Sequence, residues 1–137
     1  MGRILAVDDE LDMLTLIKMI IEGYSNHQVT MTNNPMEVSE LLSKEKFDLI
    51  ITDLKMPGLD GMELLELALK YDEDTVILMI TAFGSLESAE EAVAKGAFDY
   101  ISKPFRKDQL LLAIDKAMRW RVMALQNKEL KRQLKQE

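Results

Sequence analysis

The segment Val-Ile-Leu-Met-Ile-Thr at residues 76–81 carries the clearest structural signal in this chain of 137 residues. Five consecutive apolar residues are typical of a strand buried on both faces, because a strand with one exposed face alternates apolar with polar residues. The segment Leu-Ile-Ile-Thr-Asp at residues 49–53 begins with a similar run. We therefore expect both segments to form central strands of a parallel sheet covered by helices on its two faces.

On either side of these two strands, short apolar segments alternate with segments of helical periodicity, which is the βαβα order of an α/β domain. The sequence predicts strands at residues 3–7, 27–32, 49–53, 76–81 and 100–102. It predicts helices at residues 11–23, 35–44, 61–71, 85–95 and 107–137. The expected architecture is a doubly wound, five-stranded parallel sheet with an extended C-terminal helix.

Glycine and proline mark several expected helix ends. Gly23 and Gly96 are predicted to end the first and fourth helices, because glycine readily adopts the backbone conformation found just after a helix. Pro35 suits the first turn of the second helix, and the side chain of Asn34 is available to cap it.

The last helix has no such end, because residues 107–137 contain neither glycine nor proline. At 1.5 Å per residue it would span about 45 Å and extend beyond a domain of this size. Its second half fits a heptad pattern whose a and d positions are Trp120, Met123, Asn127, Leu130 and Leu134. Two interpretations remain open: this segment pairs with another helix as a coiled coil, or it is a solvated helix cut from a longer protein.

The composition excludes several classes of protein. With 47% hydrophobic and 30% charged residues, the chain fits one globular domain with a short appendage. The lack of cysteine excludes disulfide scaffolds, thiolate metal sites and cysteine nucleophiles, and a single histidine, His27, excludes a multi-histidine metal site. Because neither a signal peptide nor a long apolar run is apparent, we expect a cytoplasmic protein with no membrane contact.

Charge is divided unevenly along the chain. Residues 1–115 carry 10 Lys and Arg against 22 Asp and Glu, whereas residues 116–137 carry 7 against 2. The net charges are therefore −12 for the first part and +5 for the second, a split typical of a folded domain followed by a segment with another task. The acidic body opposes contact with nucleic-acid phosphates, so we expect no direct nucleic-acid binding.

Polar side chains stand where the predicted strands end, which is the edge at which open parallel sheets bind ligands. They are Asp8 and Asp9 after the first strand, Asp53 and Thr81 at the ends of the third and fourth, and Lys103 after the fifth. Two like charges about 4 Å apart repel by about 4 kcal/mol at an effective dielectric constant near 20. A bound divalent cation would relieve this repulsion, and Mg²⁺ fits best because it prefers oxygen ligands.

Four motifs at these strand ends resemble the receiver domain of two-component response regulators. They are DDE at residues 8–10, DLKMPGLDG at 53–61, TAFGS at 81–85 and AFDYISKPF at 97–105, and the resemblance covers residues 3–118. It implies a flavodoxin-like fold with strand order 2-1-3-4-5. It also implies a phosphoacceptor signalling domain and not an enzyme in the usual sense, although such a domain promotes its own phosphorylation and dephosphorylation.

The resemblance assigns a role to each acidic residue. Asp53 would accept a phosphoryl group from the phosphohistidine of a sensor histidine kinase. Asp8, Asp9, Asp53 and the backbone carbonyl of Lys55 would bind Mg²⁺, which neutralises charge on the phosphoryl oxygens.

Four further residues complete the implied site. Lys103 would pair with the same phosphoryl oxygens, and its peptide bond to Pro104 is expected to be cis. Thr81 and Tyr100 match the family's switch pair, in which the hydroxyl moves to the phosphoryl group and the ring turns inward.

Two positions bear on the lifetime of the phosphoryl group. Lys55 and Phe83 occupy places that in this family tune the attack of water on the acyl phosphate. We expect the bulk of Phe83 to shield Asp53 and to give a lifetime of minutes or longer.

The amino-acid sequence of these motifs is most similar to that of the receivers of NtrC-type, sigma-54-dependent transcriptional activators. This resemblance implies a receiver at residues 1–118 and a helical linker at 119–137 that leads to an ATPase and a DNA-binding domain in a longer protein. Homodimerisation through the linker and through the face of the fourth helix and fifth strand would then regulate transcription.

Two other functions remain alternatives. The chain is a stand-alone receiver that binds a partner protein, as in chemotaxis, or it is a Mg²⁺-dependent phosphohydrolase with an aspartate nucleophile. The second alternative is disfavoured because dehalogenase-type phosphatases place an aspartate two residues after the nucleophile, where this chain has Lys55.

Overall fold

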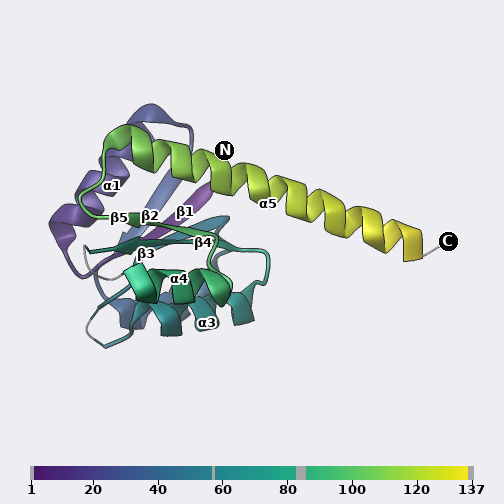
Figure 1. The fold of residues 1–137 in the computed structure, drawn as a ribbon, viewed down its shortest axis with the longest axis horizontal. Coiled ribbons are helices and arrows are strands. Elements are labelled where there is room, and N and C mark those ends of the chain that lie inside the picture. The colour runs from purple at the N-terminus through teal and green to yellow at the C-terminus, as the bar shows by residue number, and fades with distance from the viewer. Residues whose placement is uncertain (1, 57, 83–85, 136–137) are drawn as a thin grey trace.

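The computed structural model describes residues 2–56, 58–82 and 86–135 and shows a parallel sheet between two layers of helices (Figure 1). The strands are β1 (Arg3–Val7), β2 (Gln28–Thr32), β3 (Leu49–Asp53), β4 (Val76–Thr81) and β5 (Asp99–Ser102). The helices are α1 (Leu11–Tyr24), the 3-10 turn η1 (Pro35–Glu37), α2 (Val38–Lys44), α3 (Gly61–Tyr71), α4 (Leu86–Ala94) and α5 (Lys107–Lys135). The strand order β2-β1-β3-β4-β5 confirms the flavodoxin-like prediction.

The two central strands occupy the predicted positions. β4 is buried along its whole length, and β3 is buried except at Asp53. In the register of the sheet, Ile50 of β3 lies beside both Leu5 of β1 and Ile77 of β4, and all three side chains are fully buried. Each such side chain contributes about 1.5–3 kcal/mol through removal from water, so the apolar runs at 49–51 and 76–80 account for the centre of the fold.

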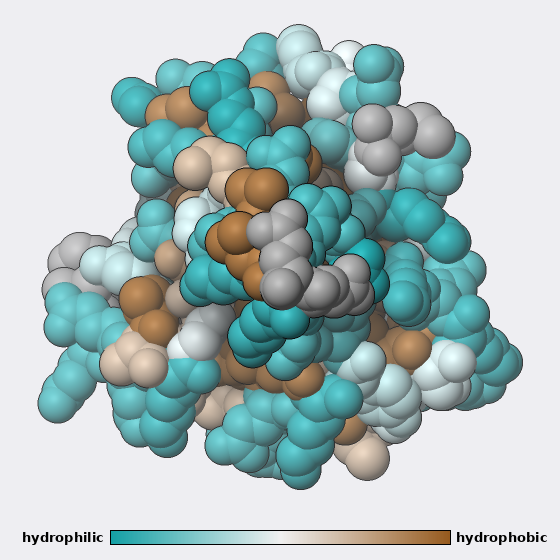
Figure 2. Space-filling model, turned by 90° about the vertical axis from the view of Figure 1, so that its right-hand side faces the viewer, coloured by the Kyte–Doolittle hydropathy of each residue, from teal (hydrophilic) through white to brown (hydrophobic). Residues whose placement is uncertain are grey.

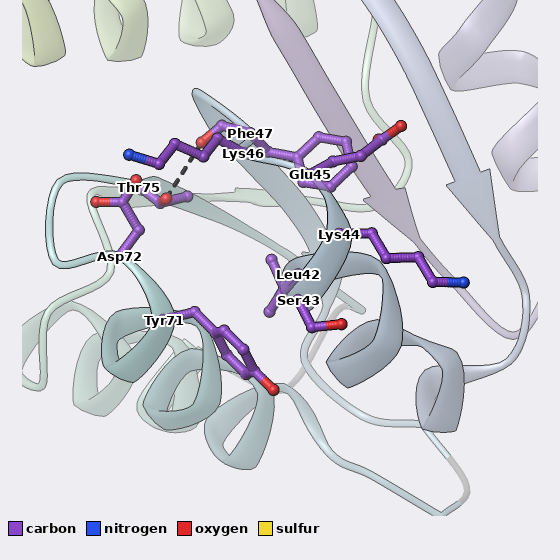
Figure 3. A pocket seen from close by; sticks show the side chains of 9 residues that line it. All are labelled: Leu42, Ser43, Lys44, Glu45, Lys46, Phe47, Tyr71, Asp72 and Thr75. Carbon is purple, nitrogen blue, oxygen red and sulfur yellow. Dashed lines mark hydrogen bonds between the residues drawn. The ribbon is translucent and has the colours of Figure 1, made fainter.

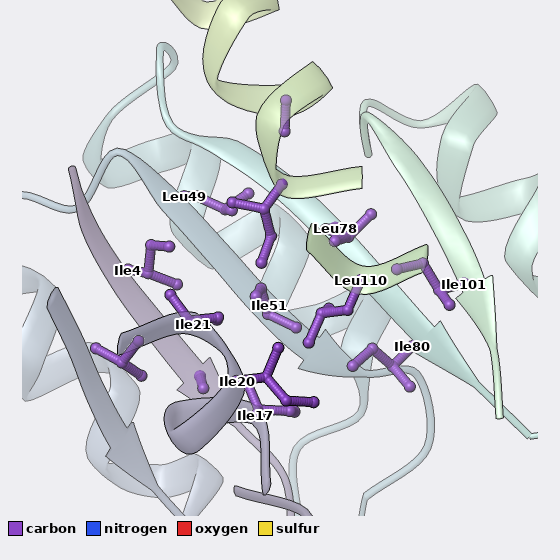
Figure 4. Packing of buried hydrophobic residues seen from close by; sticks show 14 of the residues in the cluster. Ile4, Ile17, Ile20, Ile21, Leu49, Ile51, Leu78, Ile80, Ile101 and Leu110 are labelled. Carbon is purple, nitrogen blue, oxygen red and sulfur yellow. The ribbon is translucent and has the colours of Figure 1, made fainter. Parts of the chain in front are cut away.

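Each face of the sheet has its own hydrophobic core. α1 and α5 cover one face, where Ile17 and Ile21 of α1 and Leu110 of α5 lie over the strands (Figure 4). Ile114 of α5 belongs to the same cluster. The opposite core lies beneath α2, α3 and α4 and includes Leu64 and other buried side chains of these helices. With helices on both faces of the sheet, the ends of the strands remain as the place for a ligand site.

Several predicted boundaries differ from the structure. Gly23 does not end α1, because the helix continues to Tyr24 and the Ser25 hydroxyl donates to the carbonyl of Ile21 at 2.6 Å. A side-chain hydrogen bond therefore closes this helix in place of a glycine. β2 begins after His27, and β5 begins one residue earlier than predicted, at Asp99.

The second predicted helix is divided into η1 and α2. Asn34 caps it as expected, since its Oδ1 accepts from the backbone N–H of Met36 at 3.1 Å. Gly96 has a φ of +124°, which is favourable for glycine alone, and it follows the end of α4 as predicted. Residue 85, the predicted start of α4, lies outside the described residues.

Helix α5 extends away from the body of the domain (Figure 1). Its 29 residues correspond to about 44 Å. Its first part is buried through Leu110, Ile114 and Ala117, and most of the side chains that follow are exposed. Viewed towards this end, the surface is mainly hydrophilic with separate hydrophobic patches (Figure 2). Among the described residues, no helix has both the length and the hydropathy of a membrane span.

Candidate functional site

Three charged side chains from distant parts of the sequence meet at the carboxyl edge of the sheet. Asp8 follows β1, Asp53 ends β3 and Lys103 follows β5. The Lys103 ammonium donates to Asp8 Oδ2 at 3.2 Å and to Asp53 Oδ2 at 2.9 Å. The structure therefore brings together the two carboxylates and the cation that the strand ends predicted.

The backbone around Lys103 directs its side chain into this site. Its N–H donates to the carbonyl of Thr81 at 2.7 Å, which joins the ends of β5 and β4. The peptide bond between Lys103 and Pro104 is cis, as the resemblance implied. Lys103 is thus held by its backbone on one side and by two carboxylates on the other.

Burial of the Asp8 carboxylate is electrostatically unfavourable. Its side chain is only 1% exposed, and burial raises the pKa of its carboxyl although Glu10 N–H and Lys103 both favour the charged form. Burial also opposes the charge on Lys103, but hydrogen bonds and charges from Asp53 and Asp8 outweigh it and raise the pKa of the ammonium. One cation thus serves two carboxylates, and the site keeps an excess of negative charge.

Further oxygen ligands lie at the same edge. Carboxylate oxygens of Asp8, Asp9 and Glu10 all lie within 4.8 Å of one another, with Asp9 and Glu10 exposed. Three carboxylates so close together form the hard oxygen donor set that Mg²⁺ prefers, so these residues fit the implied cation. The sequence prediction omitted Glu10, although the acidic triplet at residues 8–10 was a signal for it.

The loop after β3 positions Asp53. The backbone N–H of Lys55 donates to Asp53 Oδ1 at 3.2 Å, so each carboxylate oxygen of Asp53 has one donor. Gly61 N–H donates to the carbonyl of Leu54 at 2.7 Å, and a Cβ at Gly61 would lie 2.8 Å from the carbonyl oxygen of Asp53. A residue without a side chain is therefore required behind Asp53, and sequence reasoning did not identify it.

The predicted switch residues lie on neighbouring strands, Thr81 at the end of β4 and Tyr100 within β5. Thr81 is buried, and its hydroxyl donates to the carbonyl of Ala82 at 3.3 Å. Tyr100 is half-buried in β5. Phe83, the predicted shield of Asp53, lies outside the described residues.

The predicted linker residues all lie on α5. Trp120, Met123, Asn127, Leu130 and Leu134 are exposed, and the Trp120 ring lies 5.9 Å from the ring of Phe98. Four of these five a and d positions therefore present apolar side chains at the surface of the single chain, and Asn127 presents a polar one.

A separate hollow of about 280 Å³ lies between the C-terminal ends of α2 and α3 (Figure 3). Tyr71 and Leu42 contribute to its walls, and Thr75 beside them donates to the carbonyl of Phe47 at 3.1 Å. This hollow adjoins the amino ends of β3 and β4, away from Asp53. It therefore does not belong to the charged site.

The family model of the response regulator receiver domain matches residues 4–115. The chain belongs to the response regulator receiver domain family. Receivers are phosphoacceptor signalling domains of two-component systems, and the structure places the family's acidic and basic positions together.

Curated relatives of this receiver include longer regulators and shorter single-domain proteins. The transcriptional regulatory protein ZraR of Klebsiella oxytoca is 32% identical over 115 residues, which cover 84% of this chain and 26% of that protein. The sporulation initiation phosphotransferase F of Bacillus subtilis is 33% identical over 116 residues, which cover 83% of this chain and 91% of that protein. The receiver thus spans about a quarter of the length of ZraR.

A solved structure shows the same arrangement in a longer chain. NtrX from Brucella abortus, in complex with ADP, matches with a TM-score of 0.90 and 28% sequence identity. The match covers 94% of this receiver and 30% of the NtrX chain, and therefore includes most of α5.

Proposed function

We propose that Asp53 accepts a phosphoryl group from a phosphohistidine of a sensor histidine kinase. A carboxylate oxygen of Asp53 attacks the phosphorus, the bond to the imidazole nitrogen breaks, and the imidazole leaves as the neutral ring after gaining a proton from solvent. The observation that carries this proposal is the Lys103 ammonium shared between Asp53 and Asp8, at 2.9 and 3.2 Å. In this position the Lys103 ammonium would lie next to the oxygens of a phosphoryl group that approaches Asp53.

The proposed site also includes a divalent cation. Asp8, Asp9, Asp53 and the backbone carbonyl of Lys55 would hold Mg²⁺, which when bound supplies positive charge to the phosphoryl oxygens. The cluster of carboxylate oxygens at residues 8–10 supports this assignment.

The remaining roles belong to protein groups. Lys55 N–H orients Asp53 through Oδ1, and Lys103 is positioned to move from the carboxylates to the phosphoryl oxygens. We propose that Thr81 then leaves its bond to the Ala82 carbonyl and donates to the phosphoryl group, while the half-buried ring of Tyr100 turns inward.

These contacts must act together to change the face formed by α4 and β5. Inverting a two-state population from 1:99 to 99:1 takes about 5.5 kcal/mol. One hydrogen bond to a charged group contributes about 1.5–3 kcal/mol, which is too little alone. We therefore propose that Lys103, Thr81 and the bound cation jointly stabilise the switched packing.

We propose that the switched receiver regulates an output ATPase and DNA-binding domain in a longer transcriptional activator. Its similarity to a quarter of a transcriptional regulatory protein supports this assignment. In this proposal, residues 1–118 are the receiver and residues 119–137 are a linker through which two copies form a homodimer. The exposed side chains of Met123, Leu130 and Leu134 support pairing of this helix.

One alternative has an observation in its favour. Phosphotransferase F of Bacillus subtilis is matched over 91% of its length, so a receiver of this kind also exists without an output domain. In that case the α4–β5 face would bind a partner protein directly. A phosphohydrolase remains disfavoured because the side chain at position 55 is a lysine and offers no carboxyl acid or base.

Incubation with acetyl phosphate and Mg²⁺ tests the proposed acceptor. We expect intact-protein mass spectrometry to show one added phosphoryl group per chain, with complete loss of labelling in Asp53→Asn and no labelling in EDTA. Asp115→Asn is the matched control, because Asp115 is exposed on α5 and lies with Tyr24 and His27 along a hollow near the amino end of β2, away from the site. Labelling that persists in Asp53→Asn, or many turnovers on varied phosphate esters, would contradict the proposal.

A further inference from the structure

Helix α5 contacts the opposite, amino edge of the sheet at three places. The Trp120 ring packs against Phe98, which precedes β5, at a centroid distance of 5.9 Å. Arg121 Nη1 lies 3.1 Å from Oδ1 of Asp48, which precedes β3. These two contacts lie on neighbouring residues of the helix and reach different strands.

The third contact lies two helical turns further along. The Lys128 ammonium donates to Glu73 Oε1 and, at 3.2 Å, to Asp74 Oδ2, both in the segment before β4. Lys128 is seven residues after Arg121, so the two cations lie on the same side of the helix. We call the three contacts together the amino-edge clasp.

The acidic end of the clasp is itself held in place. The Asp74 N–H donates to Asp72 Oδ1 at 2.9 Å, and Thr75 N–H donates to the Asp72 carbonyl at 3.3 Å. The Thr75 hydroxyl in turn donates to the carbonyl of Phe47 beside β3. Lys128 therefore contacts carboxylates on a segment that is fixed to the sheet, whereas most surface ion pairs join two mobile side chains.

The clasp leaves the apolar side chains of Met123 and Leu130 uncovered. At 100° per residue, Met123 and Leu130 point away from Lys128 by about 140° and about 160° around the helix axis. Both side chains are exposed. The helix thus holds its own domain with one side and keeps its apolar side free.

We propose that the amino-edge clasp sets the direction in which residues 124–135 leave the domain, with Lys128 as its outermost positioning residue. Packing through Ala117 alone holds only the first part of α5. A helical segment of this length without tertiary contacts is marginal in water, so the contacts at residues 120, 121 and 128 are what keep the extension aligned. This inference concerns the single chain and does not depend on phosphotransfer.

The absence of native cysteine allows two spin labels to be placed without background labelling. Glu66→Cys on α3 and Gln133→Cys on α5 are both exposed sites for nitroxides. Double electron–electron resonance on labelled chain diluted with unlabelled chain reports the distance within one molecule. We expect a narrow distance distribution in this parent protein and loss of that narrow distribution in Lys128→Glu.

Charge reversal on both sides provides the decisive comparison. The variant Glu73→Lys, Asp74→Lys, Lys128→Glu restores opposite charges, so we expect the narrow distribution to return. Lys131→Glu is the matched control, because it makes the same change in net charge and Lys131 forms no ion pair within the described part of the chain. We expect its distribution to match the parent's.

Salt provides a second measurement. Raising the ionic strength from 0.1 to 1 M shortens the Debye length from about 10 to about 3 Å, so we expect broadening in the parent but little further change in Lys128→Glu. The proposal is overturned if Lys128→Glu keeps the narrow distribution, if Lys131→Glu broadens it equally, or if the charge-reversed triple variant stays broad.

Discussion

The two edges of the same sheet handle charge in opposite ways. At the carboxyl edge, Asp8 and Asp53 share the single cation of Lys103, and burial raises the pKa of Asp8. At the amino edge, Asp48 meets Arg121 and also accepts from the Arg3 N–H at 2.8 Å. Incomplete compensation leaves the first edge with excess negative charge, which the proposed cation would relieve. Opposite charges are paired more evenly at the second edge, which supports α5.

The strands themselves do not explain this difference in charge pairing, because each strand runs from the amino edge to the carboxyl edge. Parallel strands place all their carboxyl ends on one side, so the residues after each strand decide what that edge does. At the carboxyl edge, the negative charges of Asp8 and Asp53 are only partly neutralised by the single positive charge of Lys103. The residues before each strand form a different set, and here they form ion pairs and aromatic contacts with α5.

The largest change in the free energy of unfolding is expected in the hydrophobic core between the two edges. Ile77→Ala should lower the free energy of unfolding by about 2–5 kcal/mol, because it removes buried methyl groups from a tightly packed strand. Ile77 is 0% exposed. Leu130→Ala, on the exposed part of α5, should change it by no more than about 0.5 kcal/mol. Urea unfolding followed by circular dichroism measures both, and equal effects would refute the description of residues 119–135 as an appendage.

Removing one lysine at each edge tests the contrast directly. Lys103→Met should lower the free energy of unfolding by about 1–3 kcal/mol without Mg²⁺, since it leaves the buried Asp8 carboxylate without its cation. Lys44→Met removes an exposed ion pair with Glu40 near the amino edge and should cost at most about 0.5 kcal/mol. Unfolding in EDTA measures both variants.

The response to Mg²⁺ also distinguishes the two edges. Added Mg²⁺ should stabilise the parent by binding the folded state, and the stabilisation should persist in Lys44→Met. If Lys103→Met and Lys44→Met cost the same, the carboxyl edge is not under greater electrostatic strain than the amino edge.

The smallest expected effect concerns pH at the amino edge. His27 Nδ1 accepts from the Gly2 N–H at 2.9 Å, and burial lowers the pKa of His27 from 6.5 despite the opposing charges of Asp48 and Asp115. The unfolded chain therefore binds this proton more tightly, so the contribution of His27 is present above about pH 6.5 and is lost as the pH falls.

Thermal unfolding between pH 5 and pH 8 measures this contribution. His27→Gln keeps a possible acceptor but does not titrate, so the difference in melting temperature between parent and variant should shift in favour of the variant as the pH falls. A constant difference across this range would show that His27 has the same pKa in the folded and unfolded chains.

The sequence was sufficient to predict the centre of the fold and the convergence of Asp8, Asp53 and Lys103. The bounds of β3, β4 and α3 match their predictions, because continuous apolar runs and helical periodicity are signals that reside within one element. Asp8, Asp53 and Lys103 were predicted to converge because each follows a strand of one parallel sheet. In a parallel sheet, residues that stand at the carboxyl ends of different strands therefore lie close together in space.

Features that depend on contacts between distant elements were not predictable. The prediction that Gly23 ends α1 was wrong, because the helix continues to Tyr24 and the Ser25 hydroxyl donates to the free carbonyl of Ile21 in its last turn. The need for glycine at position 61 arises from the backbone of Asp53 and Leu54, which no local pattern reveals. The contact of Lys128 with Glu73 joins residues 55 positions apart, and periodicity describes only the helix on which Lys128 lies.

The length of α5 gives the Trp120–Phe98 contact a mechanical consequence. Fifteen residues separate Trp120 from Lys135, which corresponds to a rigid arm of about 22 Å. A tilt of about 10° at Trp120 would move the far end of that arm by about 4 Å. Phe98 lies immediately before β5, the strand that carries Tyr100, so a displacement of this strand that tilted α5 would pull Lys128 away from Glu73 and Asp74 and would be largest at the far end of the helix.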